Sequence, residues 1–310
     1  MSRLAVYALA AGVSLALAGC DIEDWGDMSR FKEDFSYSYP LKSGGKVSLE
    51  SFNGSVEVIG WEKDSIQITG TKYAASEELL QAIKIDISAA PDAVRIRTFR
   101  PMERRGNLGA KYVLRVPARV ELERIESSNG GVRIEGLTGP VRLKTSNGGV
   151  KIWKLKGPLE AATSNGGIEV TEFEGSAVLR SSNGGIRAEG VRGHFEATTS
   201  NASIDARLSS IESGRPVKLD TSNGPITVTL EEVKGNDIIA DTSNSSITVK
   251  LPSAAGAQAR ASTSNGNIQT DFDVSVRGTQ SKNRLEGAIG GGGPLLDLTT
   301  SNGNIRIHRL

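Results

Sequence analysis

Residues 128–199 consist of four consecutive copies of one 18-residue pattern, which read SNGGVRIEGLTGPVRLKT, SNGGVKIWKLKGPLEAAT, SNGGIEVTEFEGSAVLRS and SNGGIRAEGVRGHFEATT. After each Ser-Asn-Gly-Gly start, apolar and polar residues alternate, as in Val132, Arg133, Ile134 and Glu135. Alternation with a period of two predicts β-strands that bury one face. Asparagine and glycine accept positive φ at low cost, so the Asn-Gly step predicts a tight turn between strands.

The Ser-Asn step recurs well beyond these four copies. The repeated asparagines are Asn129, Asn147, Asn165, Asn183, Asn201, Asn223, Asn244, Asn265 and Asn302, and a degenerate copy of the turn surrounds Asn53. The first four intervals are 18 residues, and the later ones are 22, 21, 21 and 37 residues. A unit of this size cannot bury its apolar face alone, so successive units must stack. Stacked in register at about 4.8 Å per layer, the asparagine amides would form a hydrogen-bonded ladder.

The repeat therefore predicts an all-β fold, a single-stranded parallel β-helix or β-solenoid of about ten short rungs. A β-sandwich is the competing architecture, because short strands and frequent turns also suit it. A sandwich does not require the same turn residues at one fixed period, which favours the solenoid.

The solenoid domain is expected over residues 39–310. Its parts are a hairpin-bearing insertion at 74–123 that begins with a short helix, regular repeats at 124–274, a loop at 275–293 and a last rung at 294–310. The loop is interpreted as a mobile surface segment, with a binding lip as the alternative. The chain ends on a predicted strand, Asn304 to His308, and an uncovered terminal strand would favour self-association or capture of a partner.

The first 19 residues have the pattern of an export signal, with Arg3 followed by an apolar segment from Leu4 to Leu17. The segment ends Leu17-Ala18-Gly19-Cys20, which resembles a bacterial lipobox and implies covalent lipid on Cys20, the only cysteine. The alternative is an ordinary signal peptide with an incidental cysteine. Asp21 follows directly, and by resemblance to the sorting rule of some lipoproteins it favours the inner membrane. Residues 21–34 are rich in acid, and residues 20–38 are interpreted as an acidic tether, with a docking segment as the alternative.

Composition excludes several classes of function. Lys plus Arg number 37 against 36 for Asp plus Glu, so no overall field attracts nucleic acid. His194 and His308 are the only histidines and have no suitably spaced partners, so neither a metal nor another cofactor is expected. The many serines belong to the repeated turn, and no nucleophile elbow occurs.

A β-helix enzyme acting on polysaccharide, a lyase or glycosidase, is the alternative function, and it would need convergent carboxylates. The outward positions of successive repeats instead mix signs: Arg133, Lys151, Glu169, Arg187 and Asp205. Glu160 and Glu196 share a column, but Val178 lies between them, and no stack of acids is found.

Few side chains are candidates for surface contacts. Trp153 and Trp61 are possible contacts for a glycan or protein partner, although surface tryptophans often only cover their neighbours. The segment around Arg100, Arg104 and Arg105 is either an anion site or a solvated loop. A threonine ladder of the kind that binds ice begins at Thr145, Thr163 and Thr199 but is interrupted by Ser181.

The repeats, the lead-in Tyr112 to Pro117 and the ending from Gly290 to Ile305 resemble a bacterial family of proposed adhesins of unknown function, the Toastrack-type β-solenoids. The resemblance covers roughly residues 45–310. It implies an extracytoplasmic location and roles in surface attachment, envelope stress or signalling, and it carries over no catalytic or ligand residues. We therefore expect a lipid-anchored binding or scaffold protein of the cell envelope without catalytic activity, with the membrane and an envelope protein or glycan as partners.

Overall fold

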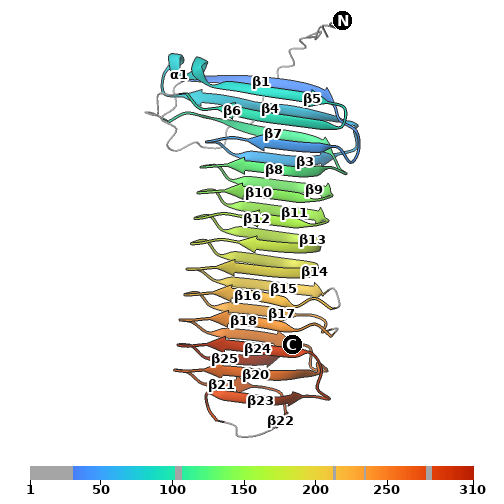
Figure 1. Cartoon of the computed structure of the whole chain (residues 1–310), viewed down its shortest axis with the longest axis vertical. Helices are drawn as coiled ribbons and strands as arrows, with labels where there is room; N and C mark the ends of the chain where they lie inside the picture. Colours follow the sequence, from blue (N-terminus) through green and yellow to red (C-terminus); the bar gives the residue numbers. More distant parts are fainter. Residues whose placement is uncertain (1–30, 102–106, 212–213, 234, 277–280) are drawn as a thin grey trace, which may run out of the picture.

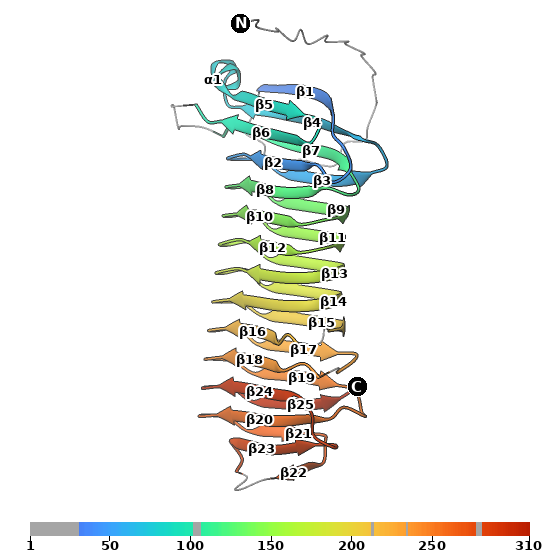
Figure 2. The same cartoon turned by 45° about the vertical axis from the view of Figure 1, so that its right-hand side comes forward.

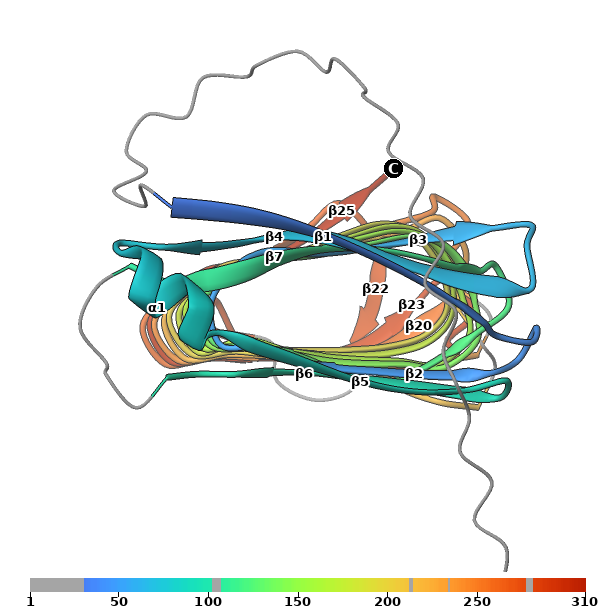
Figure 3. The same ribbon diagram turned by 90° about the horizontal axis from the view of Figure 1, so that it is seen from above.

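The computed structural model describes residues 31–101, 107–211, 214–233, 235–276 and 281–310. They form a tall column of stacked β-strands with an antiparallel cap at each end (Figure 1). Each regular rung contributes one strand to each of two opposite walls, and successive rungs pair in parallel (Figure 3). The prediction of an all-β solenoid is therefore confirmed.

The two walls are named here wall A and wall B. From the N-terminal end, wall A contains β6 (Ala93–Phe99), β2 (Lys46–Glu50), β8 (Glu121–Ser127), β10 (Val141–Thr145), β12 (Leu159–Ala162), the second halves of β13 (Ile168–Arg180) and β14 (Ile186–Thr199), β16 (Val217–Thr221), β18 (Ile238–Thr242), β24 (Leu295–Thr300) and β20 (Ala257–Thr263). Wall B contains β7 (Gly109–Pro117), β3 (Val56–Trp61), β9 (Val132–Thr138), β11 (Val150–Lys156), the first halves of β13 and β14, β15 (Ile204–Ser210), β17 (Ile226–Leu230), β19 (Ile247–Leu251), β25 (Ile305–Arg309) and β21 (Ile268–Thr270).

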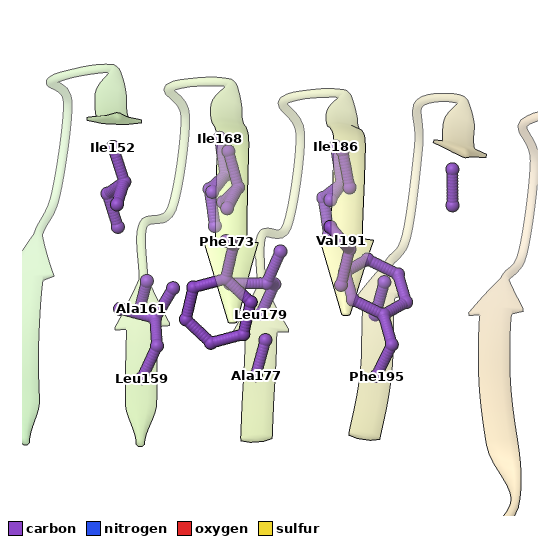
Figure 4. Close-up of a cluster of buried hydrophobic side chains, with 14 of the residues drawn as sticks. Ile152, Leu159, Ala161, Ile168, Phe173, Ala177, Leu179, Ile186, Val191 and Phe195 are labelled. Carbon is purple, nitrogen blue, oxygen red and sulfur yellow. The ribbon is translucent and has the colours of Figure 1, made fainter. Parts of the chain in front are cut away.

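The core fills the space between the walls with one layer of apolar side chains per rung. Ile168 and Ile186 are register partners on wall B and are buried. Phe173 and Phe195 are fully buried, and Phe173 lies beside Ala177 in the same layer (Figure 4). Burying one such aromatic side chain stabilises the fold by about 2–3 kcal/mol, so the stacked layers hold the walls together.

The turn that carries the repeated asparagines forms one edge of the column, and its glycine is required for a reason other than the one expected. In the described residues, no asparagine of the turn and no glycine directly after it in the regular repeats has a positive φ. A Cβ added to Gly148 would instead lie 1.9 Å from the carbonyl oxygen of Gly130. The positive φ values occur at the opposite edge, at Gly136, Lys154, Glu172 and Gly190. Close approach of neighbouring rungs, not turn handedness, therefore selects glycine at position 148.

The N-terminal cap is antiparallel. β1 (Phe31–Pro40) pairs with β4 (Ser65–Ala74), β4 pairs with β7, and β5 (Lys84–Ala90) pairs with β6. α1 (Glu77–Ala82) begins at Ser76, whose side chain accepts a hydrogen bond from the Leu79 amide. Residues 31–38 were expected in the tether but form β1, because alternate residues such as Phe35 can pack onto the core.

The segment expected as an insertion, residues 74–123, is only partly one. Its hairpin and helix are present, but β6 and β7 pair in parallel with β2 and β3 and so form the first rung of the column. The sequence could not show this, because the strand pattern of a rung and of a hairpin is the same.

The C-terminal end differs most from expectation. The residues expected in a surface loop include β22 (Val274–Val276) and β23 (Arg284–Ile289), and β23 closes the column by antiparallel pairing with β20. Residues 277–280 of that loop lie outside the described residues. The final strand, β25, was expected to be uncovered, but it pairs with both β19 and β21 (Figure 2). The last rung in sequence is therefore an interior rung in space, and β25 has no open edge for self-association.

Candidate binding surface

The outer face of wall A carries two outward columns of side chains, defined by the strand register. One column contains Arg142, Glu160, Val178, Glu196, Lys218, Ile239, Asp297 and Arg260. The other contains Glu126, Lys144, Ala162, Arg180, Thr198, Asp220, Asp241 and Thr299. We name these outward side chains the wall A face.

The N-terminal half of this face has cations without partners. Arg142 lies 3.5 Å from Glu160, and Arg124 contacts Glu126 at 2.8 Å. Lys144 and Arg180 are exposed, and within the described chain neither has an ion pair. Two mobile, solvated cations therefore remain available to a ligand.

The C-terminal half of the face is acidic. Asp220 and Asp241 are register partners on β16 and β18, so they lie on adjacent rungs about 4.8 Å apart in the stack. Asp297 lies on the next strand, β24. Partial burial, followed by the charges of Asp220 and Asp297, raises the pKa of Asp241. We name Asp220, Asp241 and Asp297 the acidic triad. Lys218 and Arg260 lie on neighbouring positions of the same face, but among the described residues neither forms a salt bridge with the triad.

The acidic triad corrects the expectation that no stack of acids exists. The signal was present in the sequence, because the residue three positions before each asparagine of the turn faces outward in this column. Counting back from Asn183, Asn223 and Asn244 gives Arg180, Asp220 and Asp241. The longer 22- and 21-residue intervals hid this correspondence from an alignment anchored on the 18-residue copies.

A shallow cavity of about 560 Å³ lies at the N-terminal end of wall A. Arg97, Arg100 and Arg124 line it together with Phe52 and Phe99. Phe99 is 45% exposed, and the Arg100 guanidinium lies 5.7 Å from the Phe52 ring centre. Arg97 and Arg124 are both held by Glu50, at 2.9 and 3.6 Å. The expected basic loop begins here, although Arg104 and Arg105 lie outside the described residues.

The asparagine side chains form a continuous ladder along one edge. Among the described residues, nine hydrogen bonds of 2.5–2.8 Å link them, each Nδ2 donating to the Oδ1 one rung nearer the N-terminal cap. The order in space is Asn53, Asn129, Asn147, Asn165, Asn183, Asn201, Asn223, Asn244, Asn302 and Asn265. Asn53 donates to the Leu108 carbonyl oxygen at 2.8 Å, which ends the ladder beneath the cap. The ladder therefore has a structural part in the fold.

The threonines before the turn are buried and do not form an ice-binding surface. Thr145, Thr163 and Thr199 are 1%, 6% and 1% exposed. The Thr145 hydroxyl donates to the Gly130 carbonyl oxygen at 3.0 Å and accepts from the Gly148 amide at 3.3 Å. These side chains join adjacent rungs from inside, so that alternative is wrong.

The two tryptophans lie on wall B and on different rungs. Trp153 is 37% exposed, its Nε1 donates to Glu172 at 3.0 Å, and the Lys154 ammonium lies 4.2 Å from its ring centre. The Trp61 Nε1 donates to the Ser65 carbonyl oxygen at 2.8 Å. The rung of β9 separates them, so they do not form one aromatic platform.

The candidate acids of the enzyme alternative are dispersed. Glu160 and Glu196 are separated by Val178 in the register, as expected. Glu160 is held by Arg142 and Glu196 by His194, whose Nε2 lies 3.2 Å away. Within the described residues no group of three potential metal ligands occurs. Glu160 and Glu196 therefore do not converge.

Cys20 and Asp21 lie outside the described residues, so lipidation and sorting remain predictions. The described part of the chain contains no helix with the length and apolar character needed to cross a membrane.

Comparison with protein families matches the family model of Toastrack DUF4097 to residues 42–308. The chain belongs to the Toastrack DUF4097 family. This confirms the resemblance drawn from the repeated turn. A search of curated proteins found no match for this Toastrack chain.

Several solved structures are similar to the Toastrack chain. One is a putative adhesin from Parabacteroides distasonis, 10% identical, with a TM-score of 0.33, covering 90% of this chain and 97% of that one. Another is a putative adhesin from Bacteroides fragilis, 10% identical, with a TM-score of 0.30 and coverage of 90% and 97%. A third is a putative lipid binding protein from Parabacteroides distasonis, 10% identical, with a TM-score of 0.26 and coverage of 89% and 96%. These scores are too low to support an argument about function.

Proposed function

We propose that this Toastrack protein is a non-catalytic, adhesin-like binding protein of the bacterial cell envelope, anchored by lipid on Cys20 and presenting the wall A face. The observation that carries the proposal is the unpaired charge on that face. Among the described residues Lys144 and Arg180 have no carboxylate partner, and the acidic triad forms no salt bridge. Charges left unpaired on a rigid sheet give an oppositely charged partner both attraction and a fixed register.

The column itself supports a role in presentation. Consecutive rungs pair along both walls, and the ladder and the buried threonines add side-chain hydrogen bonds between them. Each rung contacts only its neighbours, which is the usual basis for extended binding surfaces in solenoids. An anchored column would therefore hold the wall A face away from a membrane without moving parts.

The surface is tested by attachment of vesicles that carry the acylated full chain to envelope fragments of the producing cells. Lys144→Glu with Arg180→Glu should reduce attachment at least about tenfold, because the two free cations are replaced by carboxylates that have the same sign of charge as the partner and therefore repel it. The matched control is Lys151→Glu with Arg187→Glu, which reverses two exposed cations on wall B. Equal attachment of the two double variants would contradict the proposal.

The anchor is tested separately by metabolic labelling with palmitate. The wild-type chain should incorporate label and stay with membranes, whereas Cys20→Ser should do neither, because several acyl chains are needed for stable anchoring. The proposed lipid anchor would be contradicted if the Cys20→Ser variant incorporated label or if the wild-type chain did not. Either result would leave the proposed role of the wall A face unaffected, because that role is tested separately.

A further inference from the structure

On the wall A face, two arginines on the N-terminal side of one rung have aspartate counterparts at the same distances on its C-terminal side, although Glu160, Lys218 and Arg260 depart from this pattern. Arg180 lies one rung on the N-terminal side of Thr198, and Asp220 lies one rung on its C-terminal side. Arg142 lies three rungs to the N-terminal side of this level, and Asp297 lies three rungs to the C-terminal side. Cation and carboxylate thus occur at equal distances from a single level in the stack.

Such a face is complementary to itself. Consider a second copy related to the first by a 180° rotation. The rotation axis lies between the two wall A faces, runs parallel to the strands and passes through the level of Thr198. Each outward column then faces the same column of the second copy, in reverse order. Arg180 then faces Asp220 of the second copy, and Arg142 faces Asp297. Lys144 comes within one rung, about 4.8 Å along the stack, of Asp241. An interface of this isologous kind repeats every contact twice.

We propose that two copies of this chain pair through their wall A faces, antiparallel and with a two-fold axis at Thr198. This deepens the proposed function, on which it rests, by naming the partner as a second copy. The N-terminal caps then lie at opposite ends of the pair, so copies anchored in two facing membranes can join them.

The size of the face indicates the strength of pairing. Five residues along a strand span about 16 Å, and seven rung intervals span about 34 Å, which gives roughly 540 Å² per copy. The total of about 1,100 Å² is near the lower limit for a specific interface. A single pair is therefore weak and sensitive to salt, and membranes carrying many copies would join through multivalency.

A cysteine at the symmetry axis tests the geometry directly. Thr198 is exposed and at the axis faces Thr198 of the second copy, so the full chain with Cys20→Ser and Thr198→Cys should form a disulfide-linked dimer under mild oxidation. The matched control is Thr171→Cys in the same background, because Thr171 points outward from wall B. Preferential linking at position 198 is expected, and equal linking at both positions would overturn the proposal.

Charge exchange tests the pairing without relying on a disulfide. Arg180→Asp and Asp220→Arg should each weaken self-association at low salt at least about tenfold, the effect of roughly 1.4 kcal/mol, because each places like charges opposite one another twice. An equimolar mixture of the two single variants should regain wild-type association as a heterodimer, and a chain carrying both substitutions should also regain it. Sedimentation at rising concentration measures this, and monomeric wild type at about 100 μM in low salt, or variants that mixing does not restore, would refute the pairing.

The geometry also contains unfavourable contacts: Lys218 faces Val178, Glu160 faces Ile239, and like charges meet at the axis. Glu196 lies on the same rung as Thr198 and faces Glu196 of the second copy, although each is held by its own His194 at 3.2 Å. Glu196→Gln should therefore tighten association about two- to fivefold. Weakened association of this variant would contradict the position of the axis.

Vesicles distinguish failure of the pairing from failure of the proposed function. Vesicles that carry the acylated chain should aggregate with one another, and Arg180→Asp should abolish this aggregation. Attachment to envelope fragments without aggregation of the vesicles would leave the binding function standing and reject the second copy as partner.

Discussion

At the scale of single residues, the two glycines of the repeated turn differ in how closely the neighbouring rung approaches them. A Cβ on Gly148 would lie 1.9 Å from the Gly130 carbonyl oxygen, whereas one on Gly149 would lie 3.6 Å from the Gly167 carbonyl oxygen. The first distance is impossible without movement of the backbone, and the second is an ordinary contact. Ala202 and Ser245 replace the first glycine at two rungs, so the backbone can make room where the rest of the turn has also changed.

We therefore expect Gly148→Ala to lower the free energy of unfolding by about 2 kcal/mol, because the neighbouring rung must shift. Gly149→Ala should be neutral or stabilising by about 0.5 kcal/mol, because alanine reduces the entropy of the unfolded chain. Urea unfolding of the two variants measures the difference. Equal effects would show that the close approach of the rungs is not what selects glycine.

The acidic triad gives a second prediction at this scale. Because burial and the neighbouring carboxylates raise the pKa of Asp241, the folded state binds its proton more tightly than the unfolded state does. Its ionisation therefore destabilises the fold at neutral pH, and the penalty disappears as pH falls through the raised pKa towards the ordinary value of about 3.9.

Asp241→Asn should accordingly raise the melting temperature at pH 7 and have progressively less effect as pH is lowered to about 3.5. The measurement is made on dilute protein, so that a second copy does not supply cations. The control is Asp205→Asn, because Asp205 lies beside Arg187 on wall B. A gain that does not depend on pH would contradict the electrostatic cause.

At the scale of the structural element, each repeated turn contributes one asparagine side-chain amide to the ladder. This amide donates a hydrogen bond to the asparagine of one neighbouring rung and accepts a hydrogen bond from the asparagine of the other. Asn165 Nδ2 donates to Asn147 Oδ1 at 2.6 Å, and Asn165 Oδ1 accepts from Asn183 at 2.7 Å. An aspartate at position 165 could accept but, when ionised, could not donate. Its carboxylate would place an acceptor against the oxygen of Asn147.

Asn165→Ala should cost about 1 kcal/mol and Asn165→Asp about 2 kcal/mol at pH 7. At pH 3 the penalty of the aspartate should shrink, because the protonated acid can donate again. The control is Ser164→Ala, which should change stability by less than about 0.5 kcal/mol. Urea unfolding at the two pH values provides the comparison, and a pH-independent penalty would contradict the ladder's directionality.

The elements predicted from the sequence were those specified by local repetition. The regular rungs could be predicted because Val132, Val150, Ile168 and Ile186 occupy one column, and in the structure they are register partners. The caps could not be predicted, because their strands pair with segments that are distant in sequence. The alternation of residues in β1 fits a strand or an extended tether equally well. The position of β24 and β25 within the column could not be predicted for the same reason, because their alternation of apolar and polar residues is compatible with any rung. The distribution of charge along wall A could not be predicted either, because that prediction requires knowing which residues of the longer repeats face outward.

At the scale of the whole molecule, the column is a sum of similar layers, so its length should be adjustable. Deletion of residues 148–165 would join Asn147 to Gly166 and remove one complete rung while keeping the register of both walls. We expect a folded, cooperative protein about 4.8 Å shorter by small-angle scattering.

The matched control is deletion of residues 148–156, which removes half a rung and would bring wall B strands onto wall A. This variant should lose its cooperative unfolding transition, because apolar and polar positions no longer align. Folding of both deletion variants to the same extent would show that the register of the rungs is not what holds the column together.

The place of β25 between β19 and β21 also sets the order in which the chain can be completed. During synthesis, β20 and β21 emerge before the rung that separates them from β18 and β19. Until residues 295–309 are in place, two edges with the same spacing face each other, and premature contact between them would give a column that lacks one rung. Residues 295–309 thus fill one rung between two parts of the column, and truncation before Leu295 should be far more damaging than the small number of lost residues suggests.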